Sequence, residues 1–243
     1  MHGAGSLRSM HPPISLPAGS LLACLTCENL AFSLQALPVC QIVAKFPPSI
    51  SRMLGGMMIE MIQNADLSIL HAIQGTASPA LDTFMVGFTT LGEFGALWAI
   101  VGAIMIALNK HRTFGIAIFV AIALAFVIGD IGLKNVIERP RPFLVDPVLT
   151  TSLISLPDSF SCPSGHSSTS FAAATVICLA PLAHRWLKPT AMATAAAIAF
   201  SRLYLAVHNP TDVVLGALLG IACGCIAVCI VNTIESRRKG RQA

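Results

Sequence analysis

The stretch "SRLYLAVHNPTD", residues 201–212, closes one apolar segment and opens another, yet it carries an arginine, a histidine and an aspartate. Residues 189–200 before it hold no charged side chain, and neither do residues 213–234 after it. Charged groups at the edge of a long apolar layer are costly unless they are paired or used. The stretch therefore indicates apolar helices that hold a polar site between them.

The composition extends this interpretation to the whole chain. Of its 243 residues, 55% are hydrophobic and only 11% are charged, less than half the charged share of a soluble domain. Residues 113–129 and 167–183 also lack charged side chains, and about 20 mostly apolar residues suffice for a helix to cross a bilayer. We expect an all-α fold, a polytopic transmembrane helical bundle.

Five strong spans and one weaker segment are expected in this bundle. The weaker segment, 79–90, could combine with its neighbours into a sixth crossing, so the expected number of spans is five to six. The strong spans are expected near residues 93–109, 113–133, 167–184, 189–207 and 212–233.

The part of the chain before these spans divides into an extension and an amphipathic helix. Residues 1–57 form a poorly defined extension, and we hypothesise that the natural start lies later, at Met53, Met57, Met58 or Met61. Residues 58–72 alternate apolar and polar faces at helical spacing and end at Gly75, which predicts an interfacial helix lying along the membrane. The lone CxxC pair, Cys24 and Cys27, is weak support for a zinc or redox site.

Basic residues set the expected orientation. They cluster at 110–112, at 184–188 and at 237–241, and each pair of neighbouring clusters is separated by two apolar spans. Positive residues accumulate on the cytoplasmic side of a membrane, so a cytoplasmic C-terminus follows. Residues 58–233 then form the membrane-embedded domain and residues 234–243 a basic tail. A nucleic-acid partner is not indicated, because the basic residues are divided among short loops.

Three polar motifs fall at the opposite, extracytoplasmic ends of the spans: "KNVIERPRP" (134–142), "PSGH" (163–166) and the opening stretch. Lys134, Arg141 and Arg202 offer the ammonium and guanidinium groups that match a phosphate. The amides beside Ser164 and Gly165 lie just before a helix, where unpaired N–H groups favour an anion.

Two histidines and an aspartate supply the chemistry. Asp212 lies four residues after His208 and can fix the tautomer of its ring, which leaves one nitrogen free to attack phosphorus. His166, from another helix, can protonate the leaving oxygen. These residues predict phosphoryl transfer without a metal and without a cofactor.

The three motifs together resemble the signature of the type 2 phosphatidic acid phosphatase superfamily. The match consists of Lys134, six intervening residues and Arg141-Pro142, then "PSGH", then Ser201-Arg202 with His208 and Asp212 at the family's spacing. The resemblance implies a phosphohistidine on His208, His166 as general acid, and phosphate held by Lys134, Arg141, Arg202, Ser164 and Gly165. Cys162, before "PSGH", departs from the more usual Phe.

The expected function is an integral-membrane lipid phosphatase that acts on a lipid phosphate in the bilayer. The layout resembles undecaprenyl-diphosphate phosphatases. Phosphatidate or phosphatidylglycerophosphate hydrolysis is the alternative, and a non-hydrolytic lipid-phosphate transporter is the rival from another class. The sequence leaves the oligomeric state open.

Secondary expectations concern neighbouring residues. Asp130 is expected to pair with Lys134 one helical turn later. Arg139 is expected to be a solvated loop residue, with phosphate contact as the alternative. Gly216 and Gly220 form a GxxxG motif that could pack helices within the bundle or between subunits.

Overall fold

The computed structural model describes residues 48–109, 111–151, 153–181 and 185–241, and the regular structure within them is entirely helical. The predicted all-α class is confirmed for this part of the chain, while Cys24 and Cys27 lie outside it. The helices are α3 (Pro48–Gln74), α4 (Pro79–Leu91), η2 (Glu93–Gly95), α5 (Ala96–Ala107), α6 (Arg112–Ala125), η3 (Phe126–Leu133), α7 (Lys134–Ile137), α8 (Pro142–Val145), η4 (Pro147–Leu149), α9 (Gly165–Leu179), α10 (Leu187–Tyr204) and α11 (Pro210–Gly240).

The chain divides into two compact units, Met1–Met61 and Ile62–Ala243. The five predicted spans correspond to helices of the second unit within a few residues, and the segment 79–90 corresponds to α4. The largest difference is at the C-terminal end, where α11 continues through Arg237 and Arg238 to Gly240. No Gly or Pro interrupts the sequence between Gly224 and Gly240, so no residue there stops the helix.

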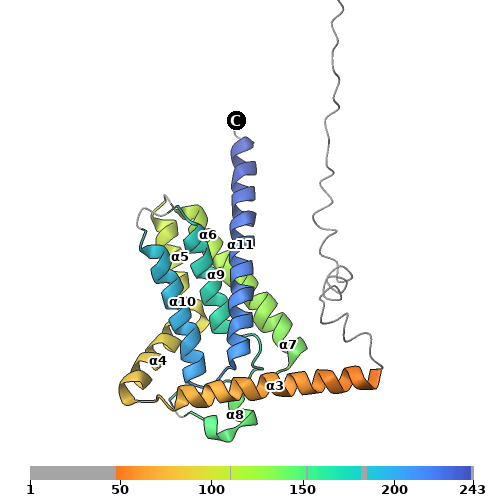
Figure 1. Ribbon diagram of the computed structural model, residues 1–243. Coiled ribbons are helices and arrows are strands. Elements are labelled where there is room, and N and C mark those ends of the chain that lie inside the picture. The colour runs from red at the N-terminus through yellow and green to blue at the C-terminus, as the bar shows by residue number, and fades with distance from the viewer. Residues whose placement is uncertain (1–47, 110, 152, 182–184, 242–243) are drawn as a thin grey trace, which may run out of the picture. The chain divides into compact units, whose positions relative to one another are not determined.

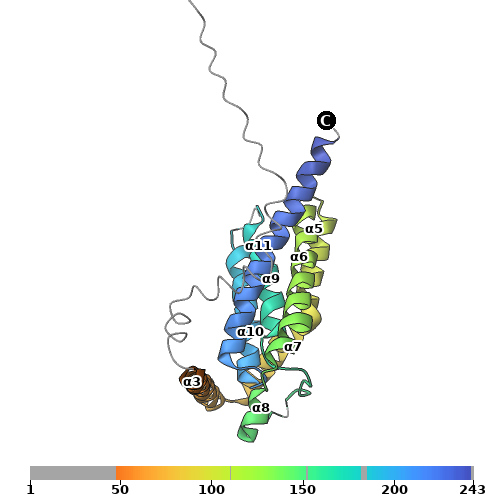
Figure 2. The ribbon, with the colours of Figure 1, turned by 90° about the vertical axis from the view of Figure 1, so that its right-hand side faces the viewer.

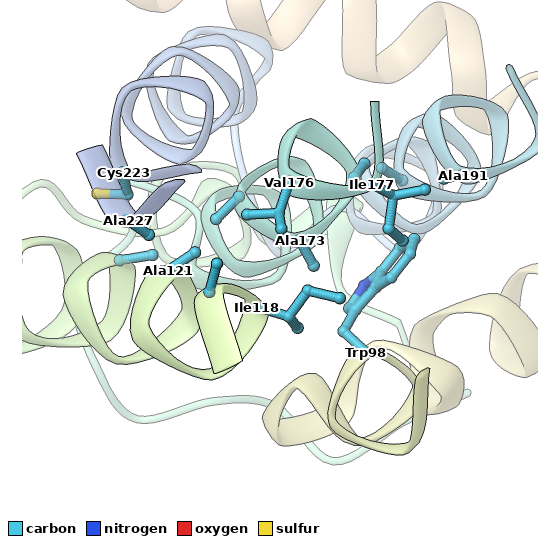
Figure 3. Close-up of a cluster of buried hydrophobic side chains, with 14 of the residues drawn as sticks. Trp98, Ile118, Ala121, Ala173, Val176, Ile177, Ala191, Cys223 and Ala227 are labelled. Atoms are coloured by element: carbon cyan, nitrogen blue, oxygen red, sulfur yellow. The ribbon is translucent and has the colours of Figure 1, made fainter. Parts of the chain in front are cut away.

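Helix α9 is the centre of the bundle. It packs against α6, α10 and α11, which run beside it (Figures 1 and 2). Figure 3 shows the apolar core, in which Ile118 and Ala121 of α6 meet Ala173 and Val176 of α9. The indole of Trp98 in α5 also reaches α9, where it donates a hydrogen bond to Ser170 Oγ at 3.0 Å. Small residues dominate these contacts, and they let the helix axes approach closely.

The closest approach lies between α9 and α11. A Cβ atom added at Gly220 would stand 2.3 Å from the carbonyl oxygen of Ser168, and one added at Gly216 would stand 2.6 Å from that of Ser164. Only glycine permits this contact. The GxxxG motif therefore packs two helices within the bundle, and it positions the start of α9 against the start of α11.

Fewer helices pass a length-and-composition test for membrane spans than the sequence predicted. Among the described residues, Arg112–Val145 and Pro210–Arg238 are long and apolar enough, and α4 with the following helix makes a third if the pair, bent by 48°, counts as one span. Helix α9 has only 15 residues and α10 has 18. Helix α9 is short because it ends at Leu179, directly before Ala180 and Pro181, and proline disfavours a helical conformation in the residue before it.

The C-terminal half of α3, which belongs to the second unit, presents two different faces. The predicted apolar stripe is exposed, with Ile62 at 46% and Ile69 at 47% of their full accessibility. The buried face instead contains Asp66 and Leu70, at 2% and 0%. Leu70 packs with Leu149 and Ala206 beside the polar motifs. The apolar stripe predicted from the sequence is thus exposed, and a different face of α3 contacts the bundle.

The α9–α11 contact can be tested by adding one methyl group. Gly220→Ala should lower the thermal midpoint in detergent by several degrees, because overpacking of this kind costs about 1–3 kcal/mol. The matched control is Gly87→Ala on α4, where nothing lies within 4 Å of the added Cβ. That variant should be unchanged or slightly more stable, since alanine favours a helix over glycine by about 1 kcal/mol. Equal midpoints for the two variants would contradict the packing described here.

Candidate active site

A cavity of about 400 Å³ lies at the end of the bundle where α7, α8 and the start of α11 are found (Figure 1). All three polar motifs contribute to its wall, which confirms that they share one end of the bundle. The predicted site residues in this wall are Lys134, Arg141, Gly165, His166, Arg202 and His208. Asp212 and Ser164 are fully buried and are not part of the wall. The remaining wall is partly apolar, with Phe94, Ile122 and Phe126.

His208 directs one ring nitrogen at a cation. Its Nε2 lies 3.4 Å from Nη1 of Arg141, and a guanidinium can only donate hydrogen bonds. Nε2 must therefore be the acceptor in this contact, which leaves the ring proton on Nδ1. Nδ1 is buried and has no hydrogen-bond partner. The free electron pair of the ring thus faces the cations of the cavity.

Asp212 lies beside His208 but is engaged elsewhere. Its Oδ2 is 4.0 Å from His208 Nδ1, beyond hydrogen-bond range. The same oxygen accepts hydrogen bonds from Ser161 Oγ at 2.5 Å and from the backbone N–H of Asn209 at 2.8 Å. The contact with Asn209 is one half of a capping box at the start of α11. The carboxylate therefore caps the start of α11 and adjoins the imidazole at the same time.

Burial controls the charge of His208. The ring is 2% exposed, and desolvation lowers its pKa well below the ordinary value of 6.5. The positive charges of Arg141, Arg202 and Lys134, in that order, lower the pKa further. His208 is therefore neutral in the folded protein at neutral pH, the form in which a ring nitrogen can act as a nucleophile.

His166 opens α9 and meets the chain segment that joins α4 to α5. The backbone of Thr89 hydrogen-bonds its ring, while Nε2 is buried without a partner. Nδ1 is therefore the nitrogen that Thr89 engages. The nearest carboxylate to Nε2 is that of Glu93, at 3.8 Å. A Cβ added at Gly92 would lie 2.7 Å from the imidazole, so this glycine leaves room for the ring.

Lys134 is held by a carboxylate inside the cavity. Its Nζ lies 2.5 Å from Asp130 Oδ1, which confirms the expected pair. The two residues flank the end of the π-helix η3, where the N–H of Lys134 bonds the carbonyl of Gly129, five residues earlier. Both carboxylate oxygens of Asp130 would stand 2.8 Å from a Cβ at Gly165, so this glycine admits the ion pair to the site. Such π turns recur at functional sites.

Arg141 uses all its donors within the protein. Nε donates to the Ser159 carbonyl at 2.6 Å and Nη1 to the Val207 carbonyl at 2.7 Å. Nη2 donates to Ser159 Oγ at 3.1 Å and to the Phe160 carbonyl at 3.3 Å. The fifth donor makes the long contact with His208. A bound anion would exchange for the longest of these contacts.

Arg202 retains free capacity. Its Nη1 donates to Thr89 Oγ1, and its Nε is buried with no hydrogen-bond partner. Both side chains are buried, at 4% and 3% exposure. A buried donor without a partner is costly, and an anion in the adjoining cavity would supply the missing acceptor.

Ser164 has a structural position. It is the N-cap of α9, its hydroxyl accepts a hydrogen bond from the N–H of Ser167, and its own N–H donates to the Asp212 carbonyl at 3.1 Å. The start of α9 is thereby joined to the start of α11. Of the two residues expected to offer backbone amides, only Gly165 reaches the cavity wall.

Arg139 is the residue that sequence reasoning placed wrongly. It was expected in solvent, but its side chain is only 16% exposed and forms ion pairs with Asp66 and Asp212. Its neighbours in the sequence gave no sign of this, because Asp66 lies on α3, far away along the chain. Asp66 itself was missed because it sits on the less apolar face of that helix.

Three comparisons place the chain among known proteins. The PAP2 superfamily matches residues 113–236. An undecaprenyl-diphosphatase of Sulfolobus acidocaldarius is 32% identical over 147 residues, 59% of this chain and 68% of the relative. A lipid A 4'-phosphatase of Bacteroides thetaiotaomicron is 30% identical over 190 residues, 74% of this chain and 83% of the relative. The crystal structure of a transmembrane PAP2-type phosphatidylglycerolphosphate phosphatase from Bacillus subtilis has a TM-score of 0.59 at 28% identity and covers 73% of this chain and 87% of its own.

The neutral state of His208 predicts a dependence of stability on pH. Unfolding exposes the ring and restores a pKa near 6.5, so below that pH the unfolded chain binds a proton that the folded chain excludes. The thermal midpoint should therefore fall as the pH drops from 7 to 5, and His208→Ala should reduce the fall. An unaltered slope in His208→Ala would show that the ring is not held neutral.

Proposed function

Because the chain belongs to the PAP2 superfamily and is a phosphatase, we propose that it is an integral-membrane lipid phosphatase that works through a phosphohistidine on His208. The observation that carries the proposal is the cavity in which His166 and His208 share one wall with Lys134, Arg141 and Arg202. Nε2 of His208 has only one long contact, and Nε2 of His166 has no hydrogen-bond partner, with Glu93 3.8 Å away. Two available ring nitrogens beside gathered cations suit the transfer of a phosphoryl group.

In the first step Nε2 of His208 attacks phosphorus. The P–N bond forms while the bond between phosphorus and the leaving oxygen breaks. The negative charge of the bound phosphate favours the protonated form of His166. The proton on its Nε2 then passes to that oxygen, so the lipid product leaves as a neutral hydroxyl or a protonated phosphate oxygen. Asp212 stabilises the positive charge that develops on the His208 ring, at a distance of 4.0 Å in the present geometry.

In the second step water regenerates the enzyme. A water molecule gives a proton to Nε2 of His166 as its oxygen attacks phosphorus, and the P–N bond breaks. Inorganic phosphate is released, and His166 is again charged. Lys134, Arg141 and Arg202 neutralise the transferred group in both steps, with the amide of Gly165 as a further donor. Ser164 supports this amide from its N-cap position.

The same proposal places the helices in a membrane. We infer five to six crossings of the membrane, and α9 and α10 are among them. Both helices are short for a span, but neighbouring helices of the bundle enclose them. The exposed stripe of α3 lies along the interface, since its isoleucines face away from the bundle. In Figure 1 the starts of α6 and α10 and the C-terminal end of α11 lie at the end of the bundle opposite α8. These segments carry Arg112, Lys188, Arg237 and Arg238, which supports a cytoplasmic C-terminus and an extracytoplasmic site.

The proposed substrate is undecaprenyl diphosphate, cleaved to undecaprenyl phosphate and phosphate. The relative from Sulfolobus acidocaldarius supports this choice, and the apolar part of the cavity wall suits a lipid chain. The other relatives are named for different lipid phosphates, so the assay must compare headgroups. Purified protein in detergent should release phosphate faster from undecaprenyl diphosphate than from phosphatidate or phosphatidylglycerophosphate; the reverse order would overturn the substrate while leaving the chemistry intact.

His208→Ala separates hydrolysis from transport. The variant should lose phosphate release by at least about 1,000-fold, because it lacks the attacking nitrogen, and it should still bind a lipid phosphate through the cations. The expected phosphoenzyme, acid-labile and stable to alkali, should form on the parent protein and be absent from the variant. Full turnover by His208→Ala would favour a transporter or another catalytic route.

Removal of divalent ions tests the metal-independent mechanism. Since protein cations alone neutralise the phosphate in this scheme, activity in excess chelator should stay within about twofold of the untreated enzyme. Readdition of magnesium should change it no further. A strict requirement for magnesium, seen as lost activity that the ion restores, would contradict the mechanism.

A further inference from the structure

Arg139 lies at the centre of a buried polar network next to the proposed site. Its Nη1 donates to Asp212 Oδ1 at 2.7 Å and to Thr211 Oγ1 at 2.5 Å. Its Nη2 donates to Asp66 Oδ2 at 2.7 Å and to Gln63 Oε1 at 2.8 Å. One planar guanidinium thus joins a carboxylate of α11 to a carboxylate of α3, an arrangement that a lysine cannot reproduce.

The carboxylate on α3 that Arg139 contacts, that of Asp66, is buried. Asp66 is 2% exposed, and its hydrogen-bond partners among the described residues are Arg139 and Thr211, which donates through its N–H at 3.2 Å and its hydroxyl at 2.5 Å. A buried carboxylate is strongly unfavourable unless it is paired. All of its recorded partners surround Asp212, so the network is directed at that residue.

The two carboxylate oxygens of Asp212 are held by different residues. Ser161 and Asn209 hold Oδ2, the oxygen nearest His208, while Arg139 holds Oδ1. The rotation of the carboxylate, and with it the approach of Oδ2 to the unpartnered Nδ1 of His208, therefore depends on Arg139. Without the guanidinium, two buried negative charges would remain unbalanced and the carboxylate could turn.

We propose that Arg139 and Asp66 are positioning residues that hold the Asp212 carboxylate in register with His208, so that the second half of α3 is part of the catalytic apparatus. This inference rests on the proposed function, in which His208 is the nucleophile. It assigns Arg139 a place behind the site, in contrast to a direct contact with phosphate: Arg139 is not part of the cavity wall.

The test is Asp66→Asn, which keeps the shape of the side chain and removes its charge. It should lower kcat about 10- to 100-fold, the range typical of groups that orient a reacting residue through another, with KM and the thermal midpoint little changed. Arg139→Gln should lower kcat in the same way, and it should also lower the thermal midpoint because two buried carboxylates lose their counter-charge. Arg139→Lys should recover only part of the activity. The matched control is Asp146→Asn, which breaks another link between α3 and the rest of the chain, the exposed 2.8 Å pair with His71, and should retain full kcat.

A double-mutant cycle shows through which residue Asp66 acts. If it works through Asp212, the double variant Asp66→Asn/Asp212→Asn should lose no more than Asp212→Asn alone. Multiplied losses, or an unchanged kcat in Asp66→Asn, would overturn the proposal even if Arg139→Gln proves unable to fold.

Inorganic phosphate serves as the probe for the competing role. Its inhibition constant should be the same in Arg139→Gln or Asp66→Asn as in the parent protein. A constant raised about tenfold at unchanged kcat would make Arg139 a phosphate ligand and contradict a positioning role. His208→Ala separates the proposed function from the positioning role of Asp66. Activity retained in His208→Ala would refute the proposed function. Activity lost in His208→Ala but fully kept in Asp66→Asn would refute only the positioning role.

Discussion

Buried positive charge is the constraint on which this end of the bundle depends. Lys134, Arg141 and Arg202 converge on one cavity, and Arg139 lies just outside its wall. Like charges in a poorly solvated place repel one another unless anions or oriented oxygens balance them. The protein balances each one separately: Asp130 faces Lys134, chain carbonyls surround Arg141, Thr89 meets Arg202, and Asp66 with Asp212 encloses Arg139. Burial lowers the pKa of His208, and the field of these cations lowers it further, so the ring stays neutral.

The scaffold serves this constraint by holding helix starts together. His166 lies in the first turn of α9 and His208 just before α11. The register of these two helices is set by Gly216 and Gly220 against the backbone of α9. The Ser164 amide then bonds the carbonyl of Asp212 across the same contact. The glycine packing and the hydrogen bond between Ser164 and Asp212 therefore both fix the contact between α9 and α11. Such a close contact requires small side chains, and small residues outnumber large ones in α9.

Much of this arrangement could be predicted from the sequence, for reasons that also explain what was missed. Apolar runs located the helices, and motif spacing brought Lys134, His166 and His208 to one end, since such signals are local in the chain. Arg139 could not be placed, because its partner Asp66 is distant in sequence and lies on a helix face that hydrophobic periodicity does not mark. The π turn before Lys134 and the saturation of Arg141 by carbonyl oxygens depend on backbone geometry, which composition does not encode. The number of crossings depends on how short helices such as α9 are enclosed, and length alone does not decide it.

The fully engaged state of Arg141 has a consequence for turnover. In the proposed mechanism this side chain would exchange internal acceptors for phosphate oxygens, so the net gain in free energy per hydrogen bond would be small. Lys134 behaves alike, because Asp130 competes for its ammonium group. A site of this kind binds the phosphate of the ground state weakly and binds the transition state, with its extra negative charge, more strongly. Inorganic phosphate can then dissociate readily, and the enzyme avoids strong inhibition by its own product.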